Sequence, residues 1–430
     1  MTAGALNDWL QWLEGVHPRE IDLGLERISV VADRMGLREV GAPIVTVAGT
    51  NGKGSTVACL ESMALAAGKT PGAYTSPHLL HYNERIRIAG EPASDALILQ
   101  AFEAINTARA EITLTYFEFA TLAAAWCFRH CEVSPWILEV GLGGRLDATN
   151  CFDADLAIVT RIDLDHMEWL GDNREAIAGE KMGIARPGRP IVCADPEPPA
   201  RIAQRAQALE APLWQLGVDY HAEPGPATWR WHAAERAYAD LPRPAWLPDN
   251  ALANAAGAVM AVSGACPALM LPEAAVREGL ARASLAGRQQ LVVADATRWL
   301  LDVGHNPSAI ALLAERLATE RERATVRMAF ALMKRKPLEP LLAELLPVVD
   351  EWFVLALDDP QAHAPDAVAA ALKAHGAVCL GEGDAALAKT RLEALSRPED
   401  LNVAAGSFRV VEAFMQQGIG GCNKQAGSRN

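Results

Sequence analysis

The stretch that decides the fold is VAGTNGKGSTVACL, residues 47–60. The apolar run PIVTVA, residues 43–48, predicts a buried strand before it, and residues 55–67 predict a helix with Gly68 as its C-cap. A buried strand, a glycine-rich turn and a helix N-terminus form an anion site, because backbone N–H groups and the helix dipole point at the same place. The sequence therefore predicts a phosphate-binding loop at the end of this strand.

The spacing inside the loop differs from the commonest phosphate-binding pattern. That pattern, G-x-x-x-x-G-K-[ST], places the hydroxyl residue directly after the lysine, whereas Gly54 separates Lys53 from Ser55 here. Lys53 can still supply a positive charge to a phosphate group. An ordinary glycine-rich turn is the alternative interpretation, and the lysine and the hydroxyl inside the loop favour phosphate binding.

Apolar runs alternate with helical patterns along the chain, which is typical of parallel α/β architecture. Further buried strands are predicted at residues 134–140, 155–160 and 190–194. Residues 214–248 predict a short β-rich section, and residues 251–271 a buried helix followed by a turn.

The alternation restarts after Gly287 and predicts a second α/β domain. Strands are expected in RWLLDV, ATVRMAFAL, EWFVLAL and LNVAAGS, with helices from Ser308 and from Pro337. We therefore expect one domain at residues 1–286, a second at residues 287–416, and a disordered tail at residues 417–430.

Composition excludes several function classes. The formal net charge is −14 with no basic run, so nucleic acid and anionic membranes are unlikely partners. The N-terminus lacks the pattern of a signal peptide, and the most apolar window, residues 251–271, is interrupted by polar residues and proline. The eight cysteines include no C-x-x-C pair, and Cys127 and Cys131 favour packing over metal binding. We expect a cytoplasmic protein.

Acidic and histidine side chains follow the predicted strands. Glu139 ends a buried strand, where ligands gather in open α/β sheets and where a carboxylate can hold Mg²⁺ beside a nucleotide. An ion pair of Glu139 with Arg145 or Arg161 is the alternative.

Asp163, Asp165 and His166 follow the next strand, and Lys181 lies on a predicted helix. His166 is a candidate metal ligand because of this position, although a lone histidine is more often a structural hydrogen-bonding residue. Residues 75–90, which include Ser76, predict a polar, basic surface loop and strand.

The second domain carries a similar group. Asp302 ends a predicted buried strand and His305 follows it, while Arg288 lies at the domain junction. An arginine between domains can clamp a transferring phosphoryl group, and an interdomain salt bridge is an equal alternative for Arg288.

The stretches together resemble the family of bacterial bifunctional dihydrofolate synthases/folylpolyglutamate synthases, relatives of the Mur ligases. The matching segments, in the family's order, are IDLGLERI, VAGTNGKGST, YTSPHLLHYNERIRI, LTYFEF, ILEVGLGGRLDATN, DHMEWLG, EKMGI, AGRQQ, LDVGHNP and AAGSF. Ligases of this group carry the G-T-N-G-K-G-[ST] loop, so the resemblance explains Gly54. It implies a P-loop domain of the Mur ligase central-domain type and a C-terminal Rossmann-like domain.

The resemblance implies an amide ligase. ATP would phosphorylate the carboxylate of 7,8-dihydropteroate or of a folate such as tetrahydrofolate, and L-glutamate would attack the acyl phosphate. ATP and Mg²⁺ are the implied co-substrate and cofactor, and a K⁺ requirement stays open. Keeping the acyl phosphate from water favours domain closure. We expect a monomer, because nothing in the sequence demands a partner.

The resemblance also implies roles for particular residues. The implied nucleotide-binding residues are Thr50, Asn51, Gly52, Lys53, Gly54, Ser55, Asn254, Arg288 and Asp302. The implied metal ligands are Ser76, Glu139, His166 and Lys181, the last as a carbamate. The implied pteroate-binding residues are Glu20, Ile21, Asp22, Leu23, Thr115, Tyr116, Phe117, Glu118, Leu146, Asp147 and Ala148. Lys53, Lys181, Arg288 and His305 are the implied catalytic residues.

The second domain departs from the family at one place. Arg335-Lys336-Pro337 stands where bacterial members show D-K-D, so both acidic residues are missing. This departure puts the details of a glutamate or cation site in doubt. Another Mur-type amino-acid ligase is the main alternative, and a P-loop kinase, a GTPase or a non-enzymatic nucleotide-binding protein would leave the second domain or the pteroate segments unexplained.

Overall fold

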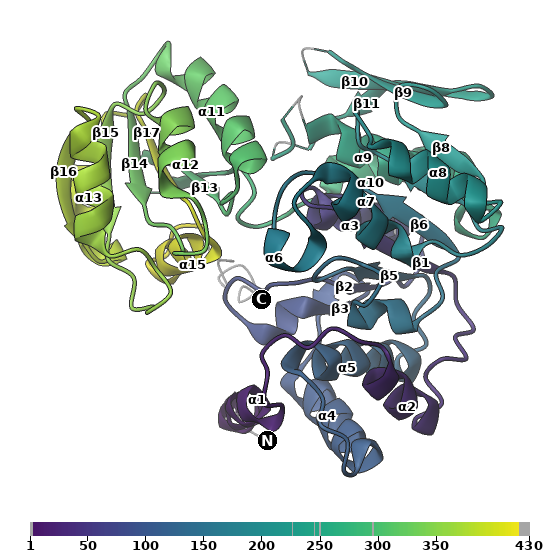
Figure 1. Ribbon diagram of the computed structural model, residues 1–430. Helices are drawn as coiled ribbons and strands as arrows, with labels where there is room; N and C mark the ends of the chain where they lie inside the picture. The colour runs from purple at the N-terminus through teal and green to yellow at the C-terminus, as the bar shows by residue number, and fades with distance from the viewer. Residues whose placement is uncertain (1–2, 226, 245, 249–250, 295, 421–430) are drawn as a thin grey trace, which may run out of the picture. The chain divides into compact units, whose positions relative to one another are not determined.

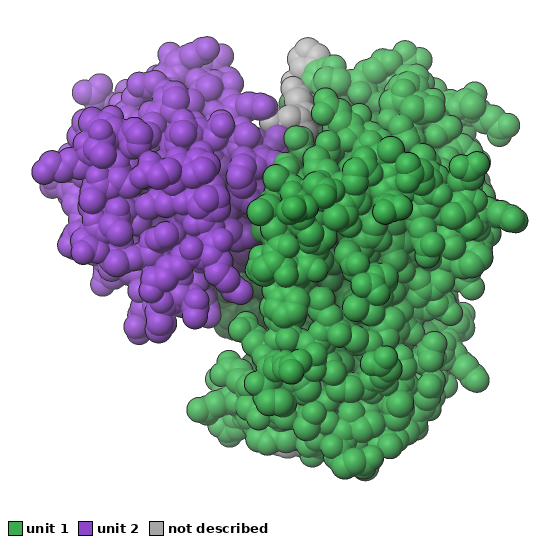
Figure 2. All heavy atoms as spheres, in the orientation of Figure 1, with its two compact units in different colours: residues 1–244, 251–284 green, residues 245–250, 285–430 purple. Residues whose placement is uncertain are grey.

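The computed structural model describes residues 3–225, 227–244, 246–248, 251–294 and 296–420. The chain divides into two compact units, residues 1–244 with 251–284, and residues 245–250 with 285–430 (Figure 2). The main division therefore falls after Ser284, close to the predicted boundary after residue 286. Of the predicted tail, residues 421–430 lie outside the described residues.

The first unit contains an eight-stranded sheet in the order β4-β3-β2-β5-β1-β6-β7-β8 (Figure 1). Its strands are β1 (Ile44–Ala48), β2 (Gly72–Tyr74), β3 (Ile86–Ile88), β4 (Glu91–Pro92), β5 (Trp136–Glu139), β6 (Leu156–Val159), β7 (Ile191–Cys193) and β8 (Leu213–Gln215). The strands from β2 to β8 along the sheet are parallel, and only β3 and β4 are antiparallel to their neighbours. All five residues of β1 are buried, as expected of a central parallel strand covered on both faces.

Ten α-helices are described in the first unit. They are α1 (Ala3–Val16), α2 (Glu26–Arg34), α3 (Lys53–Ala66), α4 (Asp95–Arg109), α5 (Tyr116–His130), α6 (Met167–Leu170), α7 (Arg174–Lys181), α8 (Ala200–Ala208), α9 (Leu252–Met260) and α10 (Glu273–Arg282). Helix α3 begins two residues earlier than predicted, because Gly52 adopts a left-handed φ of 92° and turns the chain directly into the helix. None of the described helices is long and apolar enough to cross a membrane.

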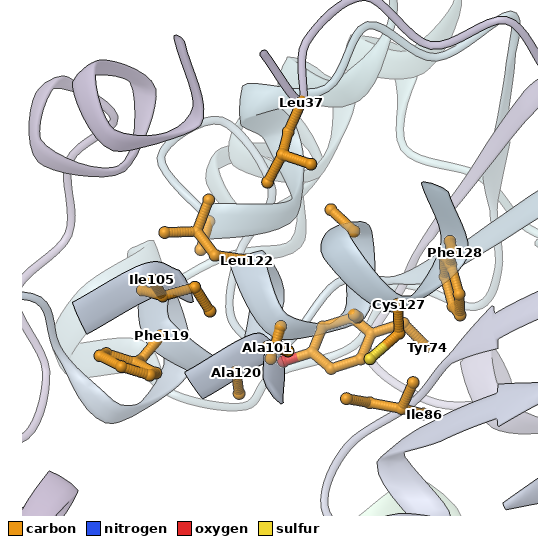
Figure 3. Packing of buried hydrophobic residues seen from close by; sticks show 14 of the residues in the cluster. Leu37, Tyr74, Ile86, Ala101, Ile105, Phe119, Ala120, Leu122, Cys127 and Phe128 are labelled. Carbon is orange, nitrogen blue, oxygen red and sulfur yellow. The ribbon is translucent and has the colours of Figure 1, made fainter. Parts of the chain in front are cut away.

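A large apolar core of this unit lies between α4, α5 and the β2–β3 end of the sheet. Figure 3 shows Tyr74 of β2 and Ile86 of β3 with Phe119 and Leu122 of α5. Cys127 is buried in the same cluster, so the packing interpretation of this cysteine is confirmed.

Helix α5 begins with a capping box. The Glu118 side chain accepts a hydrogen bond from the Thr115 N–H at 2.8 Å, and the Glu118 N–H donates to the Thr115 hydroxyl at 3.2 Å. The pattern T-x-x-E was present in the sequence and is typical of a helix start, although we assigned it only to substrate binding.

The predicted β-rich section is a separate antiparallel sheet in the order β11-β10-β9. Its strands are β9 (Tyr220–Pro224), β10 (Thr228–Ala233) and β11 (Arg236–Pro242). Trp229 and Trp231 of β10 are buried, which explains the unusual aromatic content of this segment.

The second unit is a six-stranded sheet in the order β12-β13-β17-β14-β15-β16. Its strands are β12 (Gln290–Ala294), β13 (Thr297–Asp302), β14 (Val326–Phe330), β15 (Glu351–Leu355), β16 (Val378–Gly383) and β17 (Leu401–Ala405). Its helices are α11 (Pro307–Arg321), α12 (Leu338–Leu345), α13 (Pro365–Ala374), α14 (Ala385–Leu395) and α15 (Phe408–Gln416). Only β12 is antiparallel to its neighbour, so the predicted α/β alternation is confirmed.

Helix α10 packs closely on α3, the helix that follows the phosphate-loop segment. The Ser62 hydroxyl donates to the Gly279 carbonyl at 2.7 Å. A Cβ atom at Gly279 would meet the backbone of Met63, so only glycine permits this approach.

We expect Gly279→Ala to lower the free energy of unfolding by about 1–3 kcal/mol, because the added methyl group must push two helix backbones apart. Denaturant unfolding followed by circular dichroism measures this loss. Gly15→Ala is the matched control, since Gly15 lies in α1 with open space around its Cβ position, and it should be neutral or slightly stabilising. Equal stability of the two variants would show that the α3–α10 contact is less tight than described.

Candidate active site

The loop between β1 and α3 is fastened to the end of β6. The Thr50 N–H donates to the Arg161 carbonyl at 2.8 Å. The Thr50 hydroxyl donates to the Asp163 carbonyl and accepts from the Asp163 N–H, each at 3.0 Å. The Thr160 hydroxyl donates to the Asn51 carbonyl at 2.7 Å. The loop is therefore held in place before any phosphate binds.

Asn254 of α9 lies against this loop. Its side-chain amide occupies the place that a Cβ atom at Gly52 would need. The Thr56 hydroxyl, in the first turn of α3, donates to the Gly52 carbonyl at 3.1 Å and lies 3.4 Å from the Asn254 carbonyl. Asn254 is distant in sequence, yet the structure places it beside the residues with which it was predicted to act.

Two lysines meet at one carbonyl oxygen. Lys53 Nζ donates to the Gly49 carbonyl at 3.0 Å and to the Thr50 carbonyl at 3.3 Å. Lys181 Nζ, from the end of α7, donates to the same Gly49 carbonyl at 2.9 Å. The loop thus gathers two amines that are 128 positions apart in the chain, because Lys53 and Lys181 both turn toward residue 49.

Lys181 is buried, with only 4% of its surface exposed. Burial, and after it the positive charge of Lys53, lower the pKa of Lys181 to about 7. Asp165 and Asp147 act in the opposite direction. A lysine with this pKa is substantially uncharged in neutral solution, so its amine can act as a nucleophile.

The predicted metal ligands come from neighbouring strands of one sheet edge. Glu139 is the last residue of β5 and pairs in register with Val47 of β1. Ser76 follows β2, the strand beside β5, by two residues. His166 follows β6 and precedes α6, with a left-handed φ of 50°. Since the carboxyl ends of parallel strands share one edge, the topology brings the three segments to the same side as the loop.

The donor set fits a divalent cation only in part. No group of three or more histidine, cysteine, aspartate or glutamate side chains that could hold a metal is found among the described residues. The predicted set holds only two such side chains, Glu139 and His166, with a hydroxyl and a lysine. A carbamate on Lys181 would add the anionic oxygens that a hard cation requires. Arg145, considered above as a partner of Glu139, pairs with Glu180 at 3.0 Å.

Two of the predicted pteroate-binding segments are joined by Arg27 of α2. Arg27 Nη1 donates to Asp22 Oδ2 at 2.8 Å, and Arg27 Nη2 lies 3.3 Å from Glu118 Oε1. His17 Nε2 also lies 3.0 Å from Asp22 Oδ2. The hydrogen bond from His17, followed by the charge of Arg27, lowers the pKa of Asp22 against the effect of burial. Residues 20–23 and 115–118 therefore form one surface, although Arg27 was not singled out from the sequence.

The third segment, Leu146-Asp147-Ala148, is held by its own loop. Asp147 accepts hydrogen bonds from the Leu142 N–H at 2.8 Å and from the Thr149 N–H at 3.0 Å and hydroxyl at 2.6 Å. Burial raises the pKa of Asp147, and these donors oppose the change. The described contacts give Asp147 the role of shaping the loop after β5.

Two of the predicted residues of the second unit, Arg288 and His305, lie beside Phe408 at the start of α15. The Arg288 guanidinium lies over the Phe408 ring at 5.6 Å, and the His305 ring lies 6.1 Å from it. Asp302 accepts from the Gln289 N–H at 2.9 Å and from the Gly304 N–H at 2.6 Å. Burial raises the pKa of Asp302, and Arg288 lowers it. Phe408 belongs to the quoted AAGSF segment, but its contact with Arg288 could be recognised only from the folded structure.

Residues 335–337, which differ from the D-K-D of bacterial family members, lie at the start of helix α12. Pro337 occupies the N-cap position of α12 and makes no side-chain cap hydrogen bond. An aspartate at an N-cap accepts a hydrogen bond from the first turn, so the missing acid at position 337 costs this helix a cap.

Comparisons with known proteins agree with this arrangement. The family described as Mur ligase, glutamate ligase domain matches residues 287–408. A dihydrofolate synthase/folylpolyglutamate synthase of Escherichia coli is 40% identical over 96% of this chain and 96% of its own length. The corresponding protein of Haemophilus influenzae is 36% identical over 95% of this chain and 96% of its own length.

Solved structures match over the same extent. The structure of E. coli FolC in complex with DHPP and ADP has a TM-score of 0.90 at 39% identity, covering 96% of this chain and 97% of that one. The structure of a bifunctional folylpolyglutamate synthase/dihydrofolate synthase of Yersinia pestis, complexed with AMPPNP and Mn ion, has a TM-score of 0.89 at 41% identity. It covers 96% of this chain and 97% of that one. These matches confirm the predicted fold class, and the chain belongs to the dihydrofolate synthase/folylpolyglutamate synthase family of Mur-type ligases.

Proposed function

We propose that this chain is an ATP-dependent ligase that adds L-glutamate to 7,8-dihydropteroate and to folates through an acyl phosphate. The observation that carries the proposal is the fixed loop at Gly49, with Lys53 and the buried Lys181 on one carbonyl oxygen. End-to-end similarity to bifunctional enzymes of this name supports both acceptors.

The loop residues and helix α3 bind the phosphates of ATP. Gly54 and Ser55 lie in the first turn of α3, where unpaired N–H groups and the helix dipole favour anions. Lys53 needs only to move from the loop carbonyls to a phosphate oxygen, so its positive charge is already in place. A fixed charge of this kind lowers the barrier because it requires no reorganisation during the reaction.

ATP use implies a divalent cation, and we propose Mg²⁺. When bound, the cation would neutralise phosphate charge as phosphoryl transfer proceeds. Glu139, His166, Ser76 and a carbamate on Lys181 would hold it. Formation of the carbamate joins the neutral Lys181 amine to carbon dioxide and releases one proton. The low pKa of Lys181 and its position in the fold both support this modification.

The surface made by residues 20–23 and 115–118 would grip the pteroate ring. Dihydropteroate lacks a glutamate tail, so the ring alone must place its benzoate carboxylate, and correct placement is worth several kcal/mol of barrier. We propose that Arg288, Asp302 and His305 act on the nucleotide, as the family resemblance implies. We further propose that the chain acts as a monomer in the cytoplasm.

Purified protein with ATP, Mg²⁺ and L-glutamate tests the proposal directly. Dihydropteroate and tetrahydrofolate, offered separately, should each give a product one glutamate longer, with one ADP released per amide bond. Product from tetrahydrofolate but not from dihydropteroate would refute the proposed dihydrofolate synthase activity. Product from neither, with a Mur-type precursor accepted instead, would favour another amino-acid ligase.

Lys53→Ala should reduce kcat by about 100-fold or more at saturating ATP, comparable to losing one strong electrostatic donor. The coupled ADP-release assay measures this loss. Lys69→Ala is the matched control, because Lys69 lies just beyond the other end of the same helix and is exposed. Near-normal turnover by Lys53→Ala would show that the loop does not bind the reacting phosphates.

Lys181 should carry a carbamate in the active enzyme. Protein equilibrated with ¹³C-bicarbonate at pH 8 should show one carbamate carbon resonance that Lys181→Ala lacks, because the buried amine is mostly neutral at that pH. Acetate or formate should partly restore activity to Lys181→Ala by supplying the missing oxygens. An active, metal-loaded enzyme without this resonance would contradict the modification.

Asp22→Ala should lower kcat/KM for dihydropteroate by about 10- to 100-fold, since it removes a charged hydrogen-bonding group and leaves Arg27 without it. Extension of tetrahydrofolate should fall less, because the glutamate tail adds contacts. Asp33→Ala is the matched control, because Asp33 lies in the nearby helix α2 and pairs with Arg38 at 3.6 Å near the surface. An equal loss for both acceptors would argue against a ring-specific role.

A further inference from the structure

The segment that holds the phosphate loop is itself held by two side chains from outside the loop. Thr50 is bound by the residues on either side of Ile162, which follows the end of β6. The Ile162 N–H donates to Asp195 Oδ2 at 2.9 Å, and the Ile162 carbonyl accepts from Arg174 Nε at 2.9 Å. Side chains therefore bind both backbone groups of a residue that has left the sheet, and they fix its position.

Asp195 and Arg174 also contact each other, and we call this pair the Ile162 clamp. Arg174 Nη2 lies 3.1 Å from Asp195 Oδ2. The Glu197 N–H donates to Asp195 Oδ1 at 3.0 Å, and the Glu197 carbonyl accepts from Arg174 Nη2 at 2.7 Å. Asp195 follows β7 and is only 1% exposed. A buried carboxylate with an arginine and two N–H donors is held in one position, because moving it would leave buried polar groups unpaired.

The clamp also fixes where α7 begins, since Arg174 is the first residue of this helix. α7 has eight residues, a length of about 12 Å, and it ends at Lys181, whose Nζ donates to the Gly49 carbonyl. The contacts thus form a closed ring. They run from Gly49 to Thr50, across to the backbone around Ile162, through the clamp into α7, and back to Gly49. A displacement at the clamp must therefore shift either the loop or Lys181.

The second unit contains a pair of the same composition at a different kind of edge. Asp400 is 3% exposed and accepts a hydrogen bond from Arg327 Nη1 at 2.8 Å. It also accepts from the N–H groups of Thr325 at 3.2 Å and Arg397 at 3.0 Å. Asp400 directly precedes β17 and so lies at the amino edge of its sheet, whereas ligands of open α/β sheets gather at the carboxyl edge. This pair offers a structural role without a place in the ring.

We propose that Asp195 and Arg174 are positioning residues for the ligase reaction, because the Ile162 clamp sets the separation of the phosphate loop and Lys181. This inference rests on the proposed function. Asp195 acts through Ile162, and Arg174 acts through Ile162 and α7. The predicted pteroate-binding surface is not part of the ring. The clamp therefore affects the turnover of both acceptors equally and leaves the binding of either acceptor unchanged.

The test uses the full-length enzyme with Asp195→Asn, which keeps the size of the side chain and turns an amide toward N–H donors. At saturating ATP, kcat should fall about 10- to 100-fold for dihydropteroate and for tetrahydrofolate alike, because a misplacement of about 1 Å has a cost of this order. KM for each acceptor should change less than about threefold. Asp400→Asn is the matched control, which should lower the melting temperature and leave kcat within about threefold of the wild type.

Arg174→Gln removes the clamp from its more exposed side and decides the matter if Asp195→Asn does not fold. It should reproduce the loss of kcat, and the double variant should lose no more than about threefold beyond the larger single loss, since residues that act as one unit are not additive.

Losses that multiply in the double variant would show two separate roles and overturn the inference. A loss for one acceptor only, a raised acceptor KM with unchanged kcat, or an equal loss of kcat in Asp400→Asn would overturn it as well. A wild-type enzyme that ligates neither acceptor would instead overturn the proposed function.

Discussion

The carbonyl oxygen of Gly49 is the point on which the active-site arrangement depends. It accepts hydrogen bonds from Lys53 and Lys181, and Gly49 directly follows the central strand β1. Two amines that share one acceptor destabilise each other when both are positively charged, because like charges repel. Lys181 is buried and Lys53 is more exposed, so Lys181 is the amine whose pKa is lowered and that loses its proton more easily. The phosphate site and the proposed carbamate are therefore consequences of one short loop conformation.

The predicted pteroate-binding surface is held together by side chains and not by a backbone loop. Residues 17–27 and 113–118 carry no regular pairing with each other, and side chains alone hold them together. Arg27 contacts Asp22 and Glu118, and Glu118 at the same time caps α5. The Glu118 carboxylate thus joins the contact between these two segments to the integrity of a helix end, since it serves both.

Much of the fold could be predicted from the sequence, because parallel α/β chains alternate apolar strand segments with helical patterns. Central strands such as β1 are continuous apolar runs, and the residues at their ends could be recognised as candidates from position and family resemblance. The N-terminal helices α1 and α2 and the short edge strands were not assigned, since their patterns are weak or only two to three residues long. Arg27 and Phe408 could not be given roles from the sequence, because each contacts a side chain supplied by a distant segment.

The edge strand β4, Glu91–Pro92, has a consequence for the molecule in a crowded solution. A sheet edge exposes unpaired backbone groups that can recruit strands from other chains, and brevity, charge and proline each discourage this. β4 combines all three within two residues and pairs with β3. This edge of the sheet is thus a poor template for a strand of another polypeptide.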